Sequence, residues 1–191
     1  NVDAVVYFCA SVMPLLRRKV QSLRLRIVGS EPTPEVLALG CADVEVVGFV
    51  KSTTPYLQSS DISVAPLRFG GGIKGKIGEA LAHGVPVITT AFGVEGFGFE
   101  RGKHVLVAET PEAFVSAILQ LSRDPDLYDA VRGAGWNFIN DRYSVQAVSR
   151  LLPPLLMRLA EMRSKRIAPW RRAGIFFRHY LDKYVLWRFA Q

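Results

Sequence analysis

The chain has few of the features that mark secreted, membrane-spanning or metal-binding proteins. It contains only two cysteines, Cys9 and Cys41, which are far apart and lack the paired spacing of a metal or redox site. We expect both to be small buried residues in a reducing compartment. No apolar run approaches the roughly eighteen residues needed to cross a bilayer, and the first residues show no signal-peptide pattern. These absences favour a cytoplasmic globular protein.

The order of apolar patterns along the chain predicts an α/β fold. Of the 191 residues, 49% are apolar, which is enough for one domain with a substantial core and an extension. Short β-rich runs alternate with helical patterns, as in a parallel sheet covered by helices on both faces. The expected strands span residues 25–29, 44–48, 61–65, 85–89 and 104–107, and the expected flanking helices 3–19 (kinked by Pro14), 34–39, 55–59 and 111–122.

The most informative segment is a glycine-rich loop between the strand 61–65 and a helical pattern that Gly84 ends. A helix that starts after such a loop, at the carboxyl end of a strand, presents free backbone N–H groups and the positive end of its dipole. This combination suits a phosphate, and two lysines add mobile positive charge beside it. The loop therefore predicts a phosphate or diphosphate site. Its residues are Gly70, Gly71, Gly72, Ile73, Lys74, Gly75 and Lys76.

Two interpretations of this loop compete. Residues 70–76 fit the spacing of a nucleoside-triphosphatase P-loop, but the next residue should then be Ser or Thr to bind magnesium, and it is Ile77. In the second interpretation, Glu79 lies on the same helical face as Lys76 and accepts hydrogen bonds from the hydroxyls of a ribose. Alternatively, Glu79 is a solvated helix residue paired with Lys76 or His83. On the residues alone, both functions of Glu79 stay open.

The segment from Gly70 to Ile88 resembles the donor-site segment of family-4 glycosyltransferases, the "group 1" type with the two-domain B fold (GT-B). Supporting similarities lie at residues 25–29, 46–50, 90–96 and 142–144, so that the resemblance extends from about Asn1 to Met162. The residues that carry the central resemblance are Gly70, Glu79, Ala80, Leu81, Ala82, Gly84, Val85, Pro86, Val87 and Ile88.

The resemblance implies a Rossmann-like donor-binding domain over residues 1–162, with an amino-terminal domain and the first strand of this domain missing from the chain. It implies that Glu79 binds the ribose, that the N–H groups around Gly75 and Lys76 bind the distal phosphate, and that Val50 and Lys51 border the base. The family usually carries a second glutamate eight positions before Glu79, where this chain has Gly71. That departure leaves the sugar contacts undefined, while the nucleotide site keeps its pattern.

Two other polar features have simpler structural explanations. Asp124, Pro125 and Asp126 form an Asp-x-Asp pattern that other glycosyltransferases use for manganese, but an aspartate followed by proline also begins a helix. We expect Asp124 to cap a helix and no metal to bind there. His83 precedes Gly84 at a helix end, where a partly charged imidazole complements the helix dipole.

The carboxyl-terminal tail carries the net charge of the chain. Residues 163–191 contain eight lysines or arginines and one acidic residue, which equals the whole net charge of +7. Apolar and aromatic residues recur at helical intervals between Ile175 and Ala190. A basic amphipathic helix of this kind is typical of a contact with an anionic membrane surface, here through residues 170–190. Packing against the missing domain is the alternative, and the absence of a nucleic-acid module argues against nucleic acid.

Taken together, the sequence predicts the donor domain of a glycosyltransferase. The full enzyme would transfer a sugar from a nucleoside diphosphate sugar to an acceptor hydroxyl, in the synthesis of a surface glycan or a lipid-linked saccharide. By resemblance, the transfer would retain the anomeric configuration. Lys76 and Lys74 would stabilise the departing diphosphate without a metal or another cofactor. This chain alone is expected to bind the donor but to turn over poorly. The alternative is a non-catalytic membrane- or partner-binding module with a vestigial nucleotide site.

Overall fold

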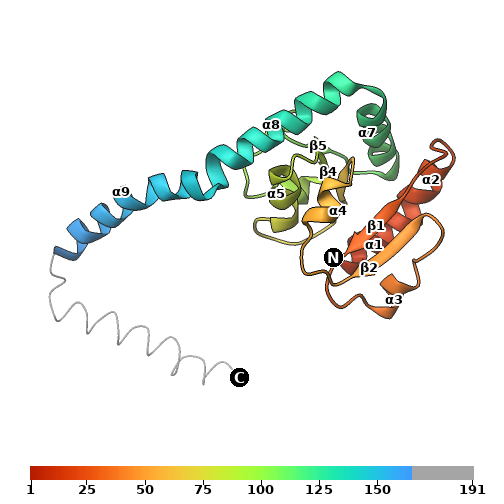
Figure 1. Ribbon diagram of the computed structural model, residues 1–191, viewed down its shortest axis with the longest axis horizontal. Helices are drawn as coiled ribbons and strands as arrows, with labels where there is room; N and C mark the ends of the chain where they lie inside the picture. Colours follow the sequence, from red (N-terminus) through yellow and green to blue (C-terminus); the bar gives the residue numbers. More distant parts are fainter. Residues whose placement is uncertain (165–191) are drawn as a thin grey trace, which may run out of the picture. The chain divides into compact units, whose positions relative to one another are not determined.

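The structure, a computed structural model, describes residues 1–164 and divides the chain into two compact units, residues 1–144 and 145–191. The predicted boundary at residue 162 falls inside the helix α9 (Val145–Ser164), and the predicted helix Ile175–Ala190 lies outside the described residues. In the first unit the chain alternates between helices and strands as the sequence predicts (Figure 1). No helix within residues 1–164 is long and apolar enough to span a membrane.

The strands of the first unit are parallel. They form a pair β1 (Leu25–Val28) and β2 (Val44–Gly48), and a triplet in the order β3 (Ser63–Ala65), β4 (Val87–Thr89) and β5 (Leu106–Val107). The predicted class, a parallel sheet covered by helices, is confirmed. These strands nevertheless form two separate sheets, because β1 and β3 are not hydrogen-bonded to each other. A cavity of about 720 Å³ lies against both strands.

Helices cover both faces of these strands (Figure 1). One core cluster joins the amino-terminal helical segment to α7 (Pro111–Arg123), and the other joins α5 (Gly75–Ala82) to α8 (Pro125–Tyr143). Between them, β4 is buried along its whole length, as expected for a strand covered on both faces. The shorter helices are α3 (Pro34–Leu37), α4 (Thr54–Gln58) and α6 (Ala91–Val94).

The first helical segment runs from Val2 to Arg17, and its hydrogen bonding changes just ahead of Pro14, where the sequence predicts a kink. Helix α1 (Val2–Tyr7) passes into a π-helical turn, η1 (Phe8–Val12), before α2 (Met13–Arg17). Proline carries no N–H, and its ring crowds the carbonyl four residues earlier. A wider π turn just ahead of the proline relieves that crowding while the helix continues.

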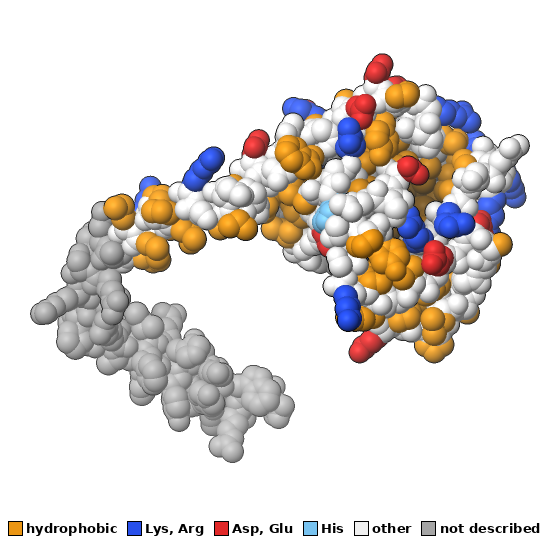
Figure 2. All heavy atoms as spheres, in the orientation of Figure 1, with side chains coloured by type: hydrophobic (Ala, Val, Ile, Leu, Met, Phe, Trp, Pro, Cys, Tyr) orange, Lys and Arg blue, Asp and Glu red, His pale blue; other side chains and the backbone are white. Residues whose placement is uncertain are grey.

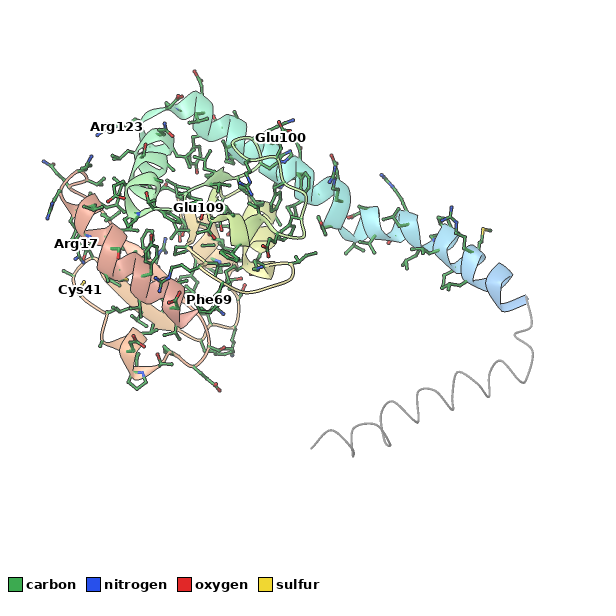
Figure 3. All side chains as sticks on the ribbon, turned by 180° about the vertical axis from the view of Figure 1, so that it is seen from behind. Arg17, Cys41, Phe69, Glu100, Glu109 and Arg123 are labelled. Carbon is green, nitrogen blue, oxygen red and sulfur yellow. The ribbon has the colours of Figure 1, made fainter. Side chains whose placement is uncertain are left out.

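The expected burial of both cysteines is wrong for Cys41, which is exposed, whereas Cys9 is half-buried. The Cys41 thiol lies beside the exposed ion pair of Arg17 and Asp43: Arg17 Nη2 is 3.4 Å from Sγ, and Sγ is 3.1 Å from Asp43 Oδ1 (Figure 3). The Arg17 guanidinium, followed by the thiol, holds the pKa of Asp43 well below its usual range. Cys41 thus lies at a polar surface turn, where no apolar neighbour covers it.

His104 makes the stability of the first unit depend on pH. Its Nδ1 accepts a hydrogen bond of 2.9 Å from the Glu100 N–H, and its ring centroid lies 4.5 Å from that of Phe138. Burial lowers the pKa of His104 below its ordinary value of 6.5. The unfolded chain therefore binds this proton more readily than the folded chain, and stability falls as the pH decreases through about 6.5. We expect the urea midpoint to fall between pH 7.5 and 5.5, and to fall less in His104→Gln. Equal decreases in both proteins would contradict this assignment.

Candidate donor site

The candidate site lies at the carboxyl ends of the parallel strands, where ligands bind in open α/β sheets. Three connections meet there: the one that follows β2 and leads to α4, the glycine-rich loop between β3 and α5, and the one that leads from β4 into α6. The first supplies residues 49–53, the second residues 66–74 and the third Thr90. The glycine-rich connection was predicted as a loop, and hydrogen bonds between the three connections show which of their residues lie together.

The glycine-rich loop has a backbone that needs glycine. Gly70 and Gly72 have φ angles of 116° and 75°, in the left-handed region that favours glycine. The Lys74 ammonium turns back and donates to the carbonyls of Gly70 (3.1 Å) and Gly72 (2.6 Å). Lys74 is also the N-cap residue of α5, so one side chain closes the loop onto the start of the helix. Lys74 therefore organises the loop as well as supplying charge.

Helix α5 begins at Gly75, and its first backbone N–H groups have no partner within the helix. The next position, Ile77, is fully buried in the core cluster of α5 and α8. A residue at this position points into the core, away from any ligand of the loop. The P-loop interpretation requires a magnesium-binding hydroxyl at this position, and the structure therefore argues against it.

The Lys76 ammonium lies at the junction of α5 with the start of the chain, where it donates to Asn1 Oδ1. Desolvation by the surrounding protein atoms lowers the pKa of Lys76. The Lys76 side chain is nevertheless exposed, so its ammonium is accessible to an anion at the start of α5. The position and environment of Lys76 thus suit a nearby phosphate.

Glu79 lies one turn further along α5 and accepts a hydrogen bond from Thr53 Oγ1. Glu79 is exposed, as the alternative of a solvated helix residue expects, but within residues 1–164 it forms no ion pair with Lys76 or His83. Thr54 and His83 form a second link between the same helices, with 3.1 Å between Oγ1 and Nε2. The start of α4 is therefore fixed against one face of α5, and the carboxylate of Glu79 is held toward the β2 connection.

Thr53 was not identified from the sequence. It lies two residues after Lys51, in a run of Ser and Thr that precedes Pro55 and is typical of a helix start. That pattern predicts α4 but does not indicate that a threonine of this turn contacts Glu79, 26 positions later. Val50 and Lys51, predicted to border a base, lie in the same connection, separated from Thr53 by Ser52, and the Lys51 side chain is exposed.

The connection from β4 supports the other side of the glycine-rich loop. Thr89 Oγ1 donates to the Ala65 carbonyl (2.7 Å), and Thr90 Oγ1 donates to the Leu67 carbonyl, so the ends of β3 and β4 are joined by buried hydroxyls. The Glu109 carboxylate, labelled in Figure 3, accepts a 2.7 Å hydrogen bond from the first N–H of α6. These buried and capping groups hold the loops in place, and sequence patterns did not identify them.

Of the predicted site residues, Lys76 and Glu79 line the cavity of about 720 Å³ beside β1 and β3. Thr53, which was not predicted, lines it with them, and Lys74 closes the adjoining glycine-rich loop. Asp124, which the sequence assigned to a helix cap, accepts a 2.9 Å hydrogen bond from the Leu127 N–H at the start of α8. The capping prediction is confirmed, and Asp124 lies on the connection between α7 and α8.

The fold and the site define a Rossmann-like domain of the kind that binds nucleotides at the carboxyl edge of a parallel sheet. Residues 1–124, more than half of the chain, match the family described as "Glycosyl transferases group 1". The chain belongs to this glycosyltransferase family, as its sequence motifs indicated.

Known proteins share this fold and extend beyond the length of this chain. A crystal structure of HepE from Anabaena in complex with UDP is similar over 78% of this chain and 44% of HepE (14% identity, TM-score 0.66). Sucrose-phosphate synthase from Thermosynechococcus elongatus is similar over 83% of this chain and 43% of its own (20% identity, TM-score 0.65). An uncharacterised 44.6 kDa protein in the cps region of Klebsiella pneumoniae is 21% identical, over 78% of this chain and 40% of its own length. The chain therefore spans less than half the length of these relatives.

Proposed function

We propose that this chain is the donor-binding part of a glycosyltransferase that transfers a sugar from a nucleoside diphosphate sugar to an acceptor hydroxyl. The observation that carries the proposal is the position of Glu79, held by Thr53 one helical turn from the glycine-rich loop and from Lys76. Family membership supports the same reaction class, and one of the similar structures contains UDP.

In the proposed site the diphosphate lies against the loop of Gly70, Gly71, Gly72 and Ile73, at the start of α5. The backbone N–H groups of Gly75 and Lys76 donate to its distal phosphate, since the first N–H groups of a helix are free to bind an anion. The ammonium groups of Lys76 and Lys74 stabilise the negative charge that grows on the diphosphate as the bond to the sugar breaks. These two lysines are the proposed catalytic residues.

The nucleoside occupies the side of the site that faces the β2 connection. Glu79 accepts hydrogen bonds from the ribose hydroxyls, and Thr53 holds the carboxylate in the required orientation. The backbone of Val50 and Lys51 borders the base. Because backbone contacts leave little side-chain signature, the identity of the base needs a measurement.

The rest of the enzyme is part of the same proposal. We propose a retaining, metal-independent transfer, with the acceptor bound by an amino-terminal domain outside residues 1–191 and the donor by residues 1–162. The pathway would build a surface glycan or a lipid-linked saccharide at the cytoplasmic side of a membrane. This chain alone would then bind the donor but complete few turnovers, because the acceptor groups lie in the other domain.

Calorimetric titration with UDP, GDP and ADP, in the presence of EDTA, tests the donor site. We expect a preference for one diphosphate, and we expect Glu79→Ala to weaken its binding by about 1–3 kcal/mol because the ribose hydroxyls lose their acceptor. Glu35→Ala, which removes an exposed carboxylate from the short helix α3, is the matched control and should bind like the wild type.

An affinity that is unchanged in Glu79→Ala would exclude the ribose assignment. If no diphosphate binds, the same titration on the longer polypeptide with its amino-terminal domain separates an incomplete site from a vestigial one. Binding by the longer protein supports the donor site. Its failure there favours the alternative, a non-catalytic module in which the basic tail binds a membrane or a partner.

A further inference from the structure

The connectivity of a nucleoside diphosphate sugar determines where the transferred sugar lies in the proposed donor site. In that site Glu79 of α5 binds the ribose, and the N–H groups of Gly75 and Lys76 bind the distal phosphate. Because the sugar is bonded to the distal phosphate, it lies beyond that phosphate, over the loop that precedes α5. The groups that this loop presents therefore determine which class of sugar it can bind.

The glycine-rich loop is rich in backbone donors that no protein group uses. Within residues 1–164, none of the N–H groups of residues 68–76 donates a hydrogen bond to another protein group. All of these residues except Lys74 are exposed. Backbone N–H groups are strong donors that are nearly always paired, so those of this loop are available to water or to a ligand. Successive N–H groups of this kind suit an anion.

Hydrogen-bond acceptors are scarce on the same loop. The Lys74 ammonium already binds the carbonyls of Gly70 and Gly72, and residues 62–78 contain no acidic side chain. A neutral sugar with several hydroxyls needs acceptors for its O–H groups, because a donor that loses water without gaining a partner costs free energy. The loop therefore suits a ligand that accepts hydrogen bonds better than one that donates them.

Two carboxylates of neighbouring segments are already engaged. Asp3 forms an ion pair with Arg68, which follows β3, and Glu109 accepts a hydrogen bond from the first N–H of α6. Glu95, at the carboxyl end of α6, is exposed and forms no ion pair within residues 1–164. Its contribution to sugar binding therefore needs a direct test.

The space and the local charge over the loop also favour an acidic group. A Cβ atom placed at Gly71 would meet no atom within 4 Å, and residues 62–78 carry Arg68, Lys74 and Lys76. The first unit as a whole contains fourteen basic and fifteen acidic residues, and both signs are interspersed on the face that Figure 2 shows. The positive charge of the loop is thus a local feature and not part of a generally basic surface.

We propose that the transferred sugar carries an ionised carboxylate, as a glycuronic acid does. The carboxylate accepts hydrogen bonds from the free N–H groups of Gly71, Gly72 and Ile73, beside the Lys74 ammonium. A carboxylate accepts several hydrogen bonds and donates none, so it matches a loop with many donors and few acceptors. This assignment rests on the proposed function, since the sugar is placed from the proposed position of the diphosphate.

Two pairs of donors that differ only at C6 of the sugar test the proposal. The probes are UDP-glucuronate with UDP-glucose, and GDP-mannuronate with GDP-mannose. Each pair keeps the base, the ribose and the diphosphate constant, so the ratio of the two affinities reports on the sugar alone. In calorimetric titration at pH 7.5 we expect the acidic member of at least one pair to bind at least about tenfold more tightly. Equal affinity within both pairs, or tighter binding of the neutral members, would overturn the proposal.

Gly71→Glu is the variant that should reverse the preference. Gly71 has no positive φ angle and an open Cβ position, so the fold can accept a longer side chain there. The new carboxylate repels an acidic sugar and offers an acceptor to a neutral one, so the ratio of acidic to neutral affinity should fall by at least about tenfold. Gly71→Gln, of the same size but uncharged, is the matched control, and its ratio should stay within about threefold of the wild type. Equal ratios in the two variants would contradict the charge mechanism.

Glu95→Gln tests the remaining exposed carboxylate. If the sugar is acidic, this variant should keep the wild-type ratio within about twofold. A selective loss of affinity for the neutral donors would show that Glu95 accepts hydrogen bonds from sugar hydroxyls, and would overturn the proposal.

Failure of the acidic-sugar proposal differs from failure of the donor site itself. If UDP or GDP binds in a manner that depends on Glu79, but no acidic donor is preferred, only the assignment of the sugar is wrong. If no diphosphate binds to the chain or to the longer polypeptide, the donor site is wrong, and the assignment of the sugar is wrong with it.

Discussion

Gly135→Ala is expected to destabilise the first unit by about 1–3 kcal/mol, although the substitution adds a single methyl group. A Cβ atom at Gly135 would lie 2.6 Å from Leu81 Cδ2 and 2.8 Å from the His104 carbonyl oxygen. Leu81 of α5 can turn aside, but the His104 carbonyl belongs to the backbone of the turn before β5. Helix α8 therefore has to shift away from that turn, which also disturbs its packing against α5. Because α5 carries Lys76 and Glu79, the same movement should weaken diphosphate binding.

Gly133→Ala is the matched control on the same helix. No atom lies within 4 Å of a Cβ placed at Gly133, so alanine there should raise stability by about 0.5–1 kcal/mol through better helix propensity. Urea unfolding of both variants at pH 7.5 measures the difference, and titration with the diphosphate measures its effect on the site. Two alanine variants of equal stability would contradict the close packing of α8 on α5.

The start of several helices could be predicted because one or two neighbouring residues determine it. Thr33, Thr110 and Asp124 each precede a proline, and each side chain accepts a hydrogen bond from the N–H three residues ahead. Such a cap needs no long-range contact, and the proline supplies the φ angle of the first helical turn. The glycine-rich loop could also be predicted from local sequence, since its left-handed φ angles favour glycine.

The parts of the site that could not be predicted depend on contacts between distant segments. The hydrogen bond from Thr53 to Glu79 joins two helices, and those of Thr89 and Thr90 join two strand ends. A serine or threonine in a loop has many local partners, so its sequence does not indicate which distant acceptor it finds. The exposure of Cys41 was missed for a related reason. Composition favours burial of a free cysteine, but the ion pair of Arg17 and Asp43 places this one at the surface.

The separation of the strands into two groups leads to the last prediction, which concerns the place that the family resemblance leaves for a further strand. The cavity of about 720 Å³ is lined by residues of β1 and β3, by apolar residues of the first helical segment and of α4, and by polar residues that include Arg26, Lys76 and Glu79. The edges of β1 and β3 thus border one cavity, whose lining is partly apolar and partly polar, and neither edge is hydrogen-bonded to the other. Two unpaired parallel edges beside one cavity provide room for a central strand.

The contacts of α1 indicate the direction from which such a strand enters. Asn1 accepts a hydrogen bond from Lys76, and Asp3 pairs with Arg68, so the start of α1 lies at the carboxyl end of β3. The helical segment then returns to the start of β1, as in the second half of a right-handed strand–helix–strand crossover. We infer that a parallel strand placed directly before Asn1 fills the cavity and joins β1 to β3.

We therefore expect a designed extension at the amino terminus to stabilise the chain. The extension consists of two polar residues, the apolar strand Val-Ile-Val-Ile-Val and two glycines joined to Asn1. A strand buried on both faces should raise the melting temperature by roughly 5–10 °C and slow hydrogen exchange at the amides of β1 and β3. It should also tighten diphosphate binding, because Lys76 and Glu79 line the same cavity.

The control extension replaces the central valine by proline, which cannot donate to the ladder and is excluded from central strands. The control extension keeps the length and nearly the same apolar character. A gain in stability that came only from non-specific burial of apolar side chains would therefore persist in it. Equal stabilisation by both extensions would contradict strand insertion. Slow exchange of the β1 and β3 amides in the unextended chain would contradict it as well, because those edges would then already be paired. Protection by the first extension alone would show that the two strand groups are halves of one sheet, completed beside the residues proposed to bind the donor.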